Sequence, residues 1–285
     1  MYLKRINNSI ASSSTRWCLL ALVCFYRFGT YFCMDQPATI EHAIIEGFDI
    51  TTAQYGLLYT MNYAPNIILP FIAGAYMDAD GLNKGIIMFM IFVTIGQIIV
   101  MTAGYIINYD LLLAGRLVFA LGYEPINVAK TVVLAKWFKG KELNTAMNTS
   151  LCFARFCVLF TGFLTPLVTE SVNIGTAFAV GLATCVIALG ASIYIVVLNM
   201  KLQAEEMQTY EENFYNHYEH DQETTPYGGC CDKTKHALAK VWRDVKSFKY
   251  QFWLLCATIV MVYISILPPA QMVSDMLIEK YSVDQ

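Results

Sequence analysis

Long apolar segments, separated by short polar connections, dominate the hydrophobic pattern of this chain. Seven of them reach the ~20 residues that a helix needs to cross the hydrocarbon core of a bilayer. Backbone polar groups in lipid must be satisfied within the segment itself, so each is predicted to be a transmembrane helix. The seven segments cover residues 17–39, 53–77, 86–107, 111–134, 145–168, 174–199 and 251–273.

The composition agrees with this pattern. Hydrophobic residues make up 56% of the chain and charged residues 14%, whereas soluble domains carry about 25% charged residues. We therefore predict an all-α membrane protein with four regions. They are a cytosolic N-terminus (1–16), a six-helix transmembrane bundle (17–199), a cytosolic connection (200–249), and a seventh helix with a short luminal end (250–285).

The positions of the 19 Lys and Arg residues predict the orientation in the membrane. Fourteen lie in the N-terminus or in the even-numbered connections between predicted helices, and only Lys280 lies on the other side. Because basic residues collect on the cytosolic side, the N-terminus is expected to be cytosolic. The remaining four lie inside predicted spans: Arg27, Arg116, Lys130 and Arg155.

The sequence lacks the patterns of soluble enzymes. Its four histidines lie outside the predicted spans, and it contains no nucleophile elbow, phosphate loop or zinc-binding spacing. The nine cysteines form no recognisable disulfide framework. We therefore expect a protein that is not an enzyme, uses no metal or cofactor, and works with a lipid bilayer rather than with nucleic acid.

Two opposite charges stand out inside the predicted spans. Glu124 and Arg155 each lie about ten residues, or ~15 Å, from the predicted cytosolic face, near the bilayer midplane. A charge there costs at least ~2.5 kcal/mol and usually faces a partner, a water-filled cavity or a substrate. Two readings stay open: contact with a zwitterionic substrate, or a permanent bridge between the two helices.

Other polar side chains are expected near these two charges. Asn127 shares a helix face with Glu124 and would bond either a substrate amide or another helix. Tyr59 and Tyr63 lie on one stripe of the second span and would either line a polar cavity or pack as aromatic core. Asp35, at the luminal end of the first span, would either serve a luminal gate or end the helix next to Pro37.

Several motifs resemble the major facilitator superfamily, in which two six-helix halves rock about a midplane site. The layout of six helices, a long loop and a further helix is the first point of similarity. The sequence itself is similar to the lysosomal dipeptide transporter family of that superfamily over nearly the whole chain. The segments similar to this family are TYFCMDQP (30–37), YAPNIIL (63–69), IGQII (95–99), GRLVFALGYEPINVAKTVVLAKWFKGKELN (115–144), LCFARF (151–156) and FWLL (252–255). GAYMDADGLNKG (74–85) resembles a short-loop signature of the superfamily as a whole.

The resemblance implies the N-terminal half of such a fold plus the first helix of the second half. It implies transport of dipeptides or similar small zwitterions by alternating access across a lysosomal or endosomal membrane. Glu124 and Arg155 fall on the positions that meet the charged ends of the dipeptide. A glycosylated single-pass accessory subunit is also implied.

The resemblance also implies gating residues. Asp78 and Lys84 fall in a short-loop signature that latches the cytosolic side, and the alternative is a tight polar turn between two spans. Arg116 falls on an arginine of the superfamily, with a role in coupling or in structural pairing.

Two residues depart from the family pattern. Lys130 stands where a glutamine is expected, and Arg27 stands where an apolar residue is expected. If Arg27 faces the site, the extra positive charge would favour a more acidic substrate; otherwise it pairs with Glu124 or faces lipid.

Alternatives to dipeptide transport stay open from the sequence. The chain holds one six-helix half plus one helix, which would also suit a truncated, non-transporting membrane module that binds a partner. A transporter of sugars or organic anions of the same superfamily is a further alternative. The plasma membrane is the alternative location, because the N-terminus carries no acidic dileucine sorting signal.

Overall fold

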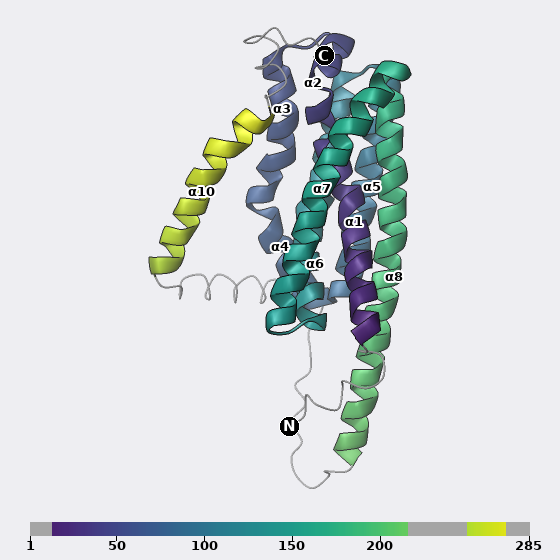
Figure 1. Cartoon of the computed structure of the whole chain (residues 1–285), viewed down its shortest axis with the longest axis vertical. Helices are drawn as coiled ribbons and strands as arrows, with labels where there is room; N and C mark the ends of the chain where they lie inside the picture. Colours follow the sequence, from purple (N-terminus) through teal and green to yellow (C-terminus); the bar gives the residue numbers. More distant parts are fainter. Residues whose placement is uncertain (1–12, 216–249, 272–285) are drawn as a thin grey trace.

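The computed structural model describes residues 13–215 and 250–271 (Figure 1). Within these ranges the backbone is almost entirely helical and forms no strand, which confirms the predicted all-α fold. The elements are α1 (Ser13–Thr39), α2 (Glu41–Phe48), α3 (Thr52–Tyr63), the 3-10 helix η3 (Ala64–Ile67), α4 (Leu69–Asp80), α5 (Leu82–Ile106), α6 (Tyr109–Trp137), α7 (Lys141–Ser171), α8 (Ile174–Tyr215) and α10 (Tyr250–Gln271).

Five of these helices are long and apolar enough to cross a membrane: α1, α5, α6, α7 and α8. They correspond to five of the seven predicted spans, with ends displaced by a few residues. The seventh predicted span becomes α10, in which the part Trp253–Val262 is a shorter apolar helix. The short helix α2, between the first two spans, has no counterpart in the predicted pattern.

The second predicted span, over residues 53–77, is not one continuous helix. It is divided into α3, η3 and α4, with Pro65 in the first turn of η3 and Pro70 in the first turn of α4. Proline lacks the N–H that would continue the ladder and its ring clashes with the preceding turn, so each proline begins a new element. The hydrophobic pattern runs through both prolines and therefore conceals the break.

Helix α8 continues to Tyr215, beyond the predicted end of the sixth span at residue 199. Residues 200–215 are polar but rich in Lys, Gln, Glu, Met and Leu, which favour helix even without an apolar face. The first part of the predicted cytosolic connection is thus helical. Its remainder, residues 216–249, lies outside the described residues, as do 1–12 and 272–285.

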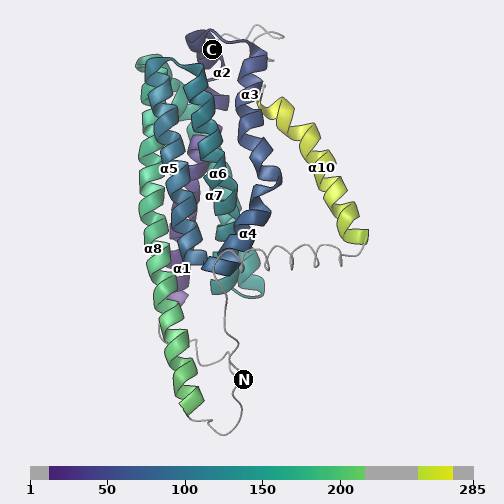
Figure 2. The same cartoon turned by 180° about the vertical axis from the view of Figure 1, so that it is seen from behind.

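The five long helices form a bundle that the two views show from opposite sides (Figures 1 and 2). Helix α5 packs against α6 and α8, and α1 packs against α8 and α7. The broken second span packs on α6. Helix α10 stands to one side of this bundle, next to α3 and α4, in both views.

Glycine residues set the closest approach between helices. A Cβ added to Gly122 of α6 would overlap the backbone carbonyl oxygen of Phe89 in α5. A Cβ added to Gly96 of α5 would likewise overlap the backbone of Phe119 in α6. Small residues that let backbones meet are the usual way to join helices in lipid, where no hydrophobic driving force acts between them.

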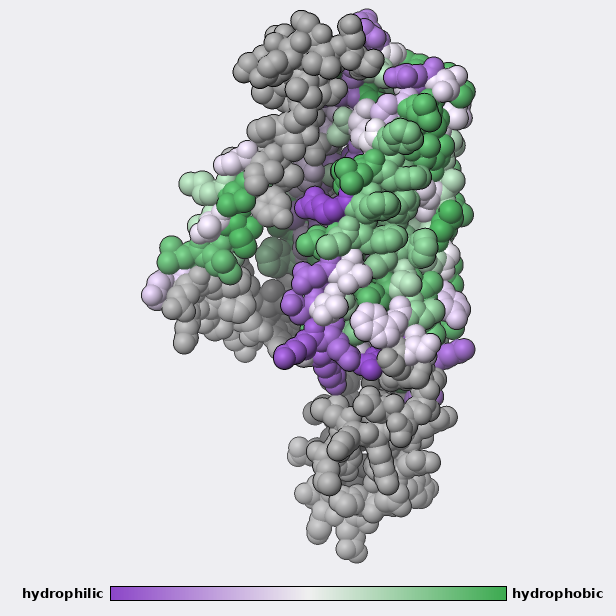
Figure 3. Space-filling view, viewed as in Figure 1, coloured by the Kyte–Doolittle hydropathy of each residue, from purple (hydrophilic) through white to green (hydrophobic). Residues whose placement is uncertain are grey.

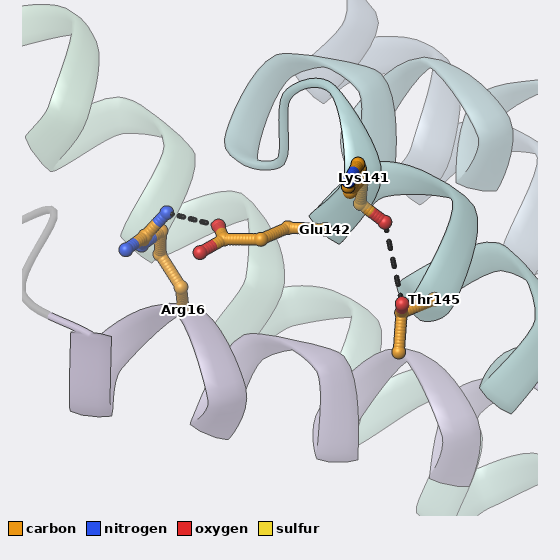
Figure 4. A network of polar contacts seen from close by, with 4 residues as sticks. All are labelled: Arg16, Lys141, Glu142 and Thr145. Atoms are coloured by element: carbon orange, nitrogen blue, oxygen red, sulfur yellow. Dashed lines mark hydrogen bonds and ion pairs between the residues drawn. The ribbon is translucent and has the colours of Figure 1, made fainter.

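Polar groups gather at the end of the bundle where α1 begins, whereas α7 shows the viewer a largely apolar face (Figure 3). Arg16 of α1 forms an ion pair there with Glu142 in the first turn of α7, with Nη1 and Oε2 2.7 Å apart (Figure 4). In the same turn, the Thr145 hydroxyl donates to the Lys141 carbonyl at 3.2 Å. The exposed Arg16–Glu142 pair contributes at most about 1 kcal/mol but links the starts of two helices.

Candidate binding site

Three charged residues lie near the midpoints of three helices. Arg27 comes 14 residues after the start of α1 and 12 before its end. Glu124 comes 15 residues after the start of α6 and 13 before its end. Arg155 comes 14 residues after the start of α7 and 16 before its end. The helix bounds therefore place all three at a similar depth, as counting along the sequence predicts.

Arg27 is held by side chains on α1 and α6. Its Nη2 donates to the hydroxyl of Tyr31 at 2.6 Å, and its guanidinium carbon lies 4.4 Å from the centre of the Tyr31 ring. Its Nη1 donates to Oδ1 of Asn127 at 3.1 Å. With 5% of its surface exposed, Arg27 faces the interior of the bundle rather than lipid. Packing on a ring and two hydrogen bonds offset part of its burial cost.

Asn127 connects Arg27 to Glu124. Its carbonyl oxygen accepts from Arg27, and its side chain lies within hydrogen-bonding reach of the Glu124 carboxylate. An amide has both an acceptor and donors, so one side chain satisfies a cation and an anion together. Glu124 lies one position before Pro125, whose missing N–H leaves the Leu121 carbonyl without its helical donor.

The structure does not show a permanent Glu124–Arg155 bridge. Both residues are described, and the ion pairs found in the described part of the chain join Arg16 to Glu142 and His42 to Glu46. Arg27 and Lys130 are the cations that act electrostatically on Glu124. Arg155, which is exposed on α7, acts instead on the half-buried Asp35 of α1. Glu124 and Arg155 thus have different neighbours from each other, and the Arg27–Glu124 neighbourhood is one of the alternatives that the sequence left open.

Arg116 has a structural task at the end of α1. It is 1% exposed, and it donates to the backbone carbonyls of Cys33 at 3.0 Å and Met34 at 3.1 Å. Pro37 stands four residues after Cys33 and lacks the N–H that would normally reach that carbonyl. Arg116 therefore replaces the helical donor that the proline removes, which supports the pairing interpretation of this residue.

The tyrosines of α3 form a row that leads toward the same region. Tyr55 donates to the carbonyl of Pro37 at 3.0 Å, and its hydroxyl lies 3.2 Å from that of Tyr59. The rings of Tyr59 and Tyr63 stack with centroids 6.4 Å apart. Tyr63 is half-buried and within electrostatic range of both Asp35 and Glu124. This row connects the polar groups of α1 and α6 on the side of the broken second span.

The predicted latch residues are placed apart from this region. Asp78, near the end of α4, and Lys84, near the start of α5, are both exposed. No ion pair joins them, although both belong to the described residues. A pairing of Asp78 with Lys84 is therefore absent, and a latch through another element stays a prediction.

Two site residues have only weak signals in the sequence. Tyr31 lies four residues after Arg27 on one face of α1, a spacing that allows contact. Its ring lies 5.7 Å from that of Tyr123, the residue before Glu124. Tyrosines are frequent in apolar helices as packing residues, so neither stands out without knowledge of the helix rotation.

Apolar helices with charged groups gathered at their midpoints define the class: a multi-pass membrane protein with a polar site in its interior. The model of the Major Facilitator Superfamily matches residues 17–280, so the chain belongs to this superfamily. The match covers the five long helices apart from the first residues of α1, and it confirms the family resemblance of the sequence motifs.

Curated relatives point to one group within the superfamily. The chain is 29% identical over 277 residues to the lysosomal dipeptide transporter MFSD1 of Bos taurus, covering 93% of this chain and 54% of the relative. It is 28% identical over 274 residues to the Danio rerio protein of the same name, covering 92% and 54%. It is 28% identical over 264 residues to that of Homo sapiens, covering 89% and 52%. The chain thus spans about half the length of the curated relatives it matches.

Proposed function

We propose that the complete protein is a secondary transporter that moves dipeptides or similar small zwitterions by alternating access. The observation that carries the proposal is that Glu124 is a carboxylate without a direct ion pair among the described residues. It lies at the middle of α6, where the side chain of Asn127 is within hydrogen-bonding reach of it. A half-buried carboxylate of this kind retains acceptor capacity for an incoming ammonium group.

The second half of the proposed site is Arg155. Its guanidinium is exposed on α7, and no hydrogen bond or ion pair occupies it in the described part of the chain. A zwitterion needs an acceptor for its ammonium and a forked donor for its carboxylate, and arginine makes the second contact bidentate. Glu124 and Arg155 offer these two groups from different helices of the bundle.

The depth of these residues supports alternating access. In this superfamily two halves rock about a site near the bilayer midplane, so each face of the membrane reaches it in turn. Glu124, Arg27 and Arg155 lie at the midpoints of their helices. The end of the bundle where α1 begins carries basic side chains, among them Arg16, Lys84 and Lys141. Basic residues collect on the cytosolic side, so this supports a cytosolic N-terminus.

The lysosomal transporters among the relatives support a lysosomal membrane as the location, with an endosomal membrane as the wider proposal. An accessory glycoprotein remains an expectation from the family resemblance alone. Asp35, Asp78 and Lys84 remain proposed gating residues, and Tyr59 and Tyr63 remain proposed wall residues. Each of these roles depends on the transport function itself.

The test is uptake of a labelled dipeptide by the complete protein in liposomes. Glu124→Gln and Arg155→Ala are each expected to lower the uptake efficiency at least tenfold, because each removes one charge-assisted contact of about 1.5–3 kcal/mol. Glu170→Gln is the matched control, since Glu170 is an exposed carboxylate at the far end of α7 and is expected to leave uptake unchanged.

Normal dipeptide uptake by either site variant would show that Glu124 and Arg155 do not hold the substrate. No saturable uptake of any dipeptide by the unaltered protein would overturn the proposed function. Uptake of sugars or organic anions in the same liposomes would then favour the alternative substrate classes.

A further inference from the structure

We infer that the site prefers dipeptides whose first residue has an acidic side chain, with Lys130 as the residue that receives it. This inference rests on the proposed transport function. It is carried by the arrangement of Arg27, Asn127 and Lys130 around Glu124, which exceeds what a neutral dipeptide needs.

The first observation is an excess of positive charge. Arg27 and Lys130 both act on Glu124, and they also repel each other. One carboxylate therefore lies between two cations near the middle of the membrane-spanning helices. A charge at this depth is costly, and two neighbouring cations with one anion leave one positive charge that no anion compensates. A negatively charged group of the substrate would compensate this remaining positive charge.

The second observation is that donors remain unused. The Nε of Arg27 is buried and has no hydrogen-bond partner, although both of its Nη atoms are bonded. Lys130 is half-buried and makes no hydrogen bond or ion pair within the described residues. The buried Nε of Arg27 is a charged donor without an acceptor, which is rare and costly. The half-buried ammonium of Lys130 can contact a substrate carboxylate, which would then also lie in the field of Arg27.

The position of these cations selects the first residue of the peptide. If Glu124 receives the ammonium, the side chain on the adjacent carbon lies closest to the neighbours of Glu124, which are Arg27 and Lys130. The terminal carboxylate is assigned to Arg155, whose acidic neighbour is Asp35. An acidic second residue would meet the negative charge of Asp35 and would be disfavoured.

The alternative is that Arg27 and Lys130 only keep Glu124 ionised and contact no substrate. In that case uptake would depend on Lys130, but the preference between peptides would not. The two cases differ in a ratio of uptake efficiencies, which cancels any general loss of activity.

The experiment measures uptake of labelled Ala-Ala by the complete protein in liposomes, with unlabelled Asp-Ala, Asn-Ala and Ala-Asp as competitors. Asp-Ala is expected to compete about tenfold more strongly than its neutral isostere Asn-Ala, the effect of one charge-assisted contact. Ala-Asp is expected to be no stronger than Asn-Ala. Lys130→Gln is expected to abolish the Asp-Ala preference, whereas Lys130→Arg, which keeps the charge, retains it.

Lys136→Gln is the matched control, because Lys136 lies in the last turn of the same helix α6, and it should keep the preference. Equal competition by Asp-Ala and Asn-Ala in the unaltered protein overturns the inference while the proposed function stands. An Asp-Ala preference that survives Lys130→Gln also overturns it. Absence of Ala-Ala uptake altogether is a failure of the proposed function instead.

Discussion

At the scale of single residues, partners decide the role of each charge. Arg27 and Arg116 are both buried arginines within apolar helices, yet their partners differ. Arg27 reaches the side chains of Asn127 and Tyr31, whereas Arg116 bonds the backbone carbonyls of α1. The first arrangement places a cation beside the side chains next to Glu124. The second completes a helix and serves its shape.

This division leads to a prediction for Arg116. Arg116→Leu should destabilise the protein by about 2 kcal/mol, because it leaves the buried Cys33 carbonyl without a donor and removes a second hydrogen bond to the Met34 carbonyl. In a Pro37→Ala background the helix regains the N–H for Cys33, so the same change should cost at least about 1 kcal/mol less. Thermal unfolding of the four proteins in detergent measures this coupling. Strictly additive effects would contradict the assignment.

The depth of the site residues could be predicted from the sequence, but their partners could not. Counting along the spans places Arg27, Glu124 and Arg155 at the middle of their helices, as the structure shows. Which charges meet depends on the rotation of each helix about its axis. A rotation by one residue is about 100° and carries a side chain from one neighbour to another. The Asn127 connection and the Asp35–Arg155 neighbourhood therefore emerge only from the packed bundle.

At the scale of elements, prolines and glycines shape helices that look alike in their hydrophobic pattern. The second span is broken at Pro65 and Pro70, and the first is repaired at Pro37 by Arg116. Glycines set the contact between α5 and α6. Apolar periodicity predicts that a span exists, but it carries no signal for the breaks, because the prolines stand within unbroken apolar runs.

The contact between α5 and α6 can be tested at Gly122. Gly122→Val should separate the two helices, because its side chain would overlap the Phe89 carbonyl oxygen and Val93. Overpacking of this kind costs about 1–3 kcal/mol or more. The expected result is a lower yield of folded protein and a lower thermal midpoint in detergent. Gly190→Val is the control, since nothing lies within 4 Å of the added Cβ. Equal stability of the two variants would contradict this packing account.

At the scale of the whole molecule, the five long helices are not held equally. Helices α1 and α6 carry most of the polar site, and 61% and 50% of their most apolar stretches are buried within the described residues, whereas α7 has only 22% buried. Its main partner is α1, through aromatic rings such as Phe28 with Phe153 and Phe160. Arg155 is therefore carried by the helix with the smallest buried share.

The small buried share of α7 within the described residues has a consequence for how long a substrate would stay bound. If Arg155 holds the substrate carboxylate, as proposed, release of that carboxylate should follow local opening of α7 rather than the strength of one ion pair. Hydrogen exchange of the complete protein should then show slower exchange in the middle of α7 when a transported dipeptide is present, with little change in α5. Equal exchange of α7 with and without dipeptide would separate substrate release from this motion. If the slowing is found, residues at the α1–α7 contact, far from either charge, become the ones that set the residence time.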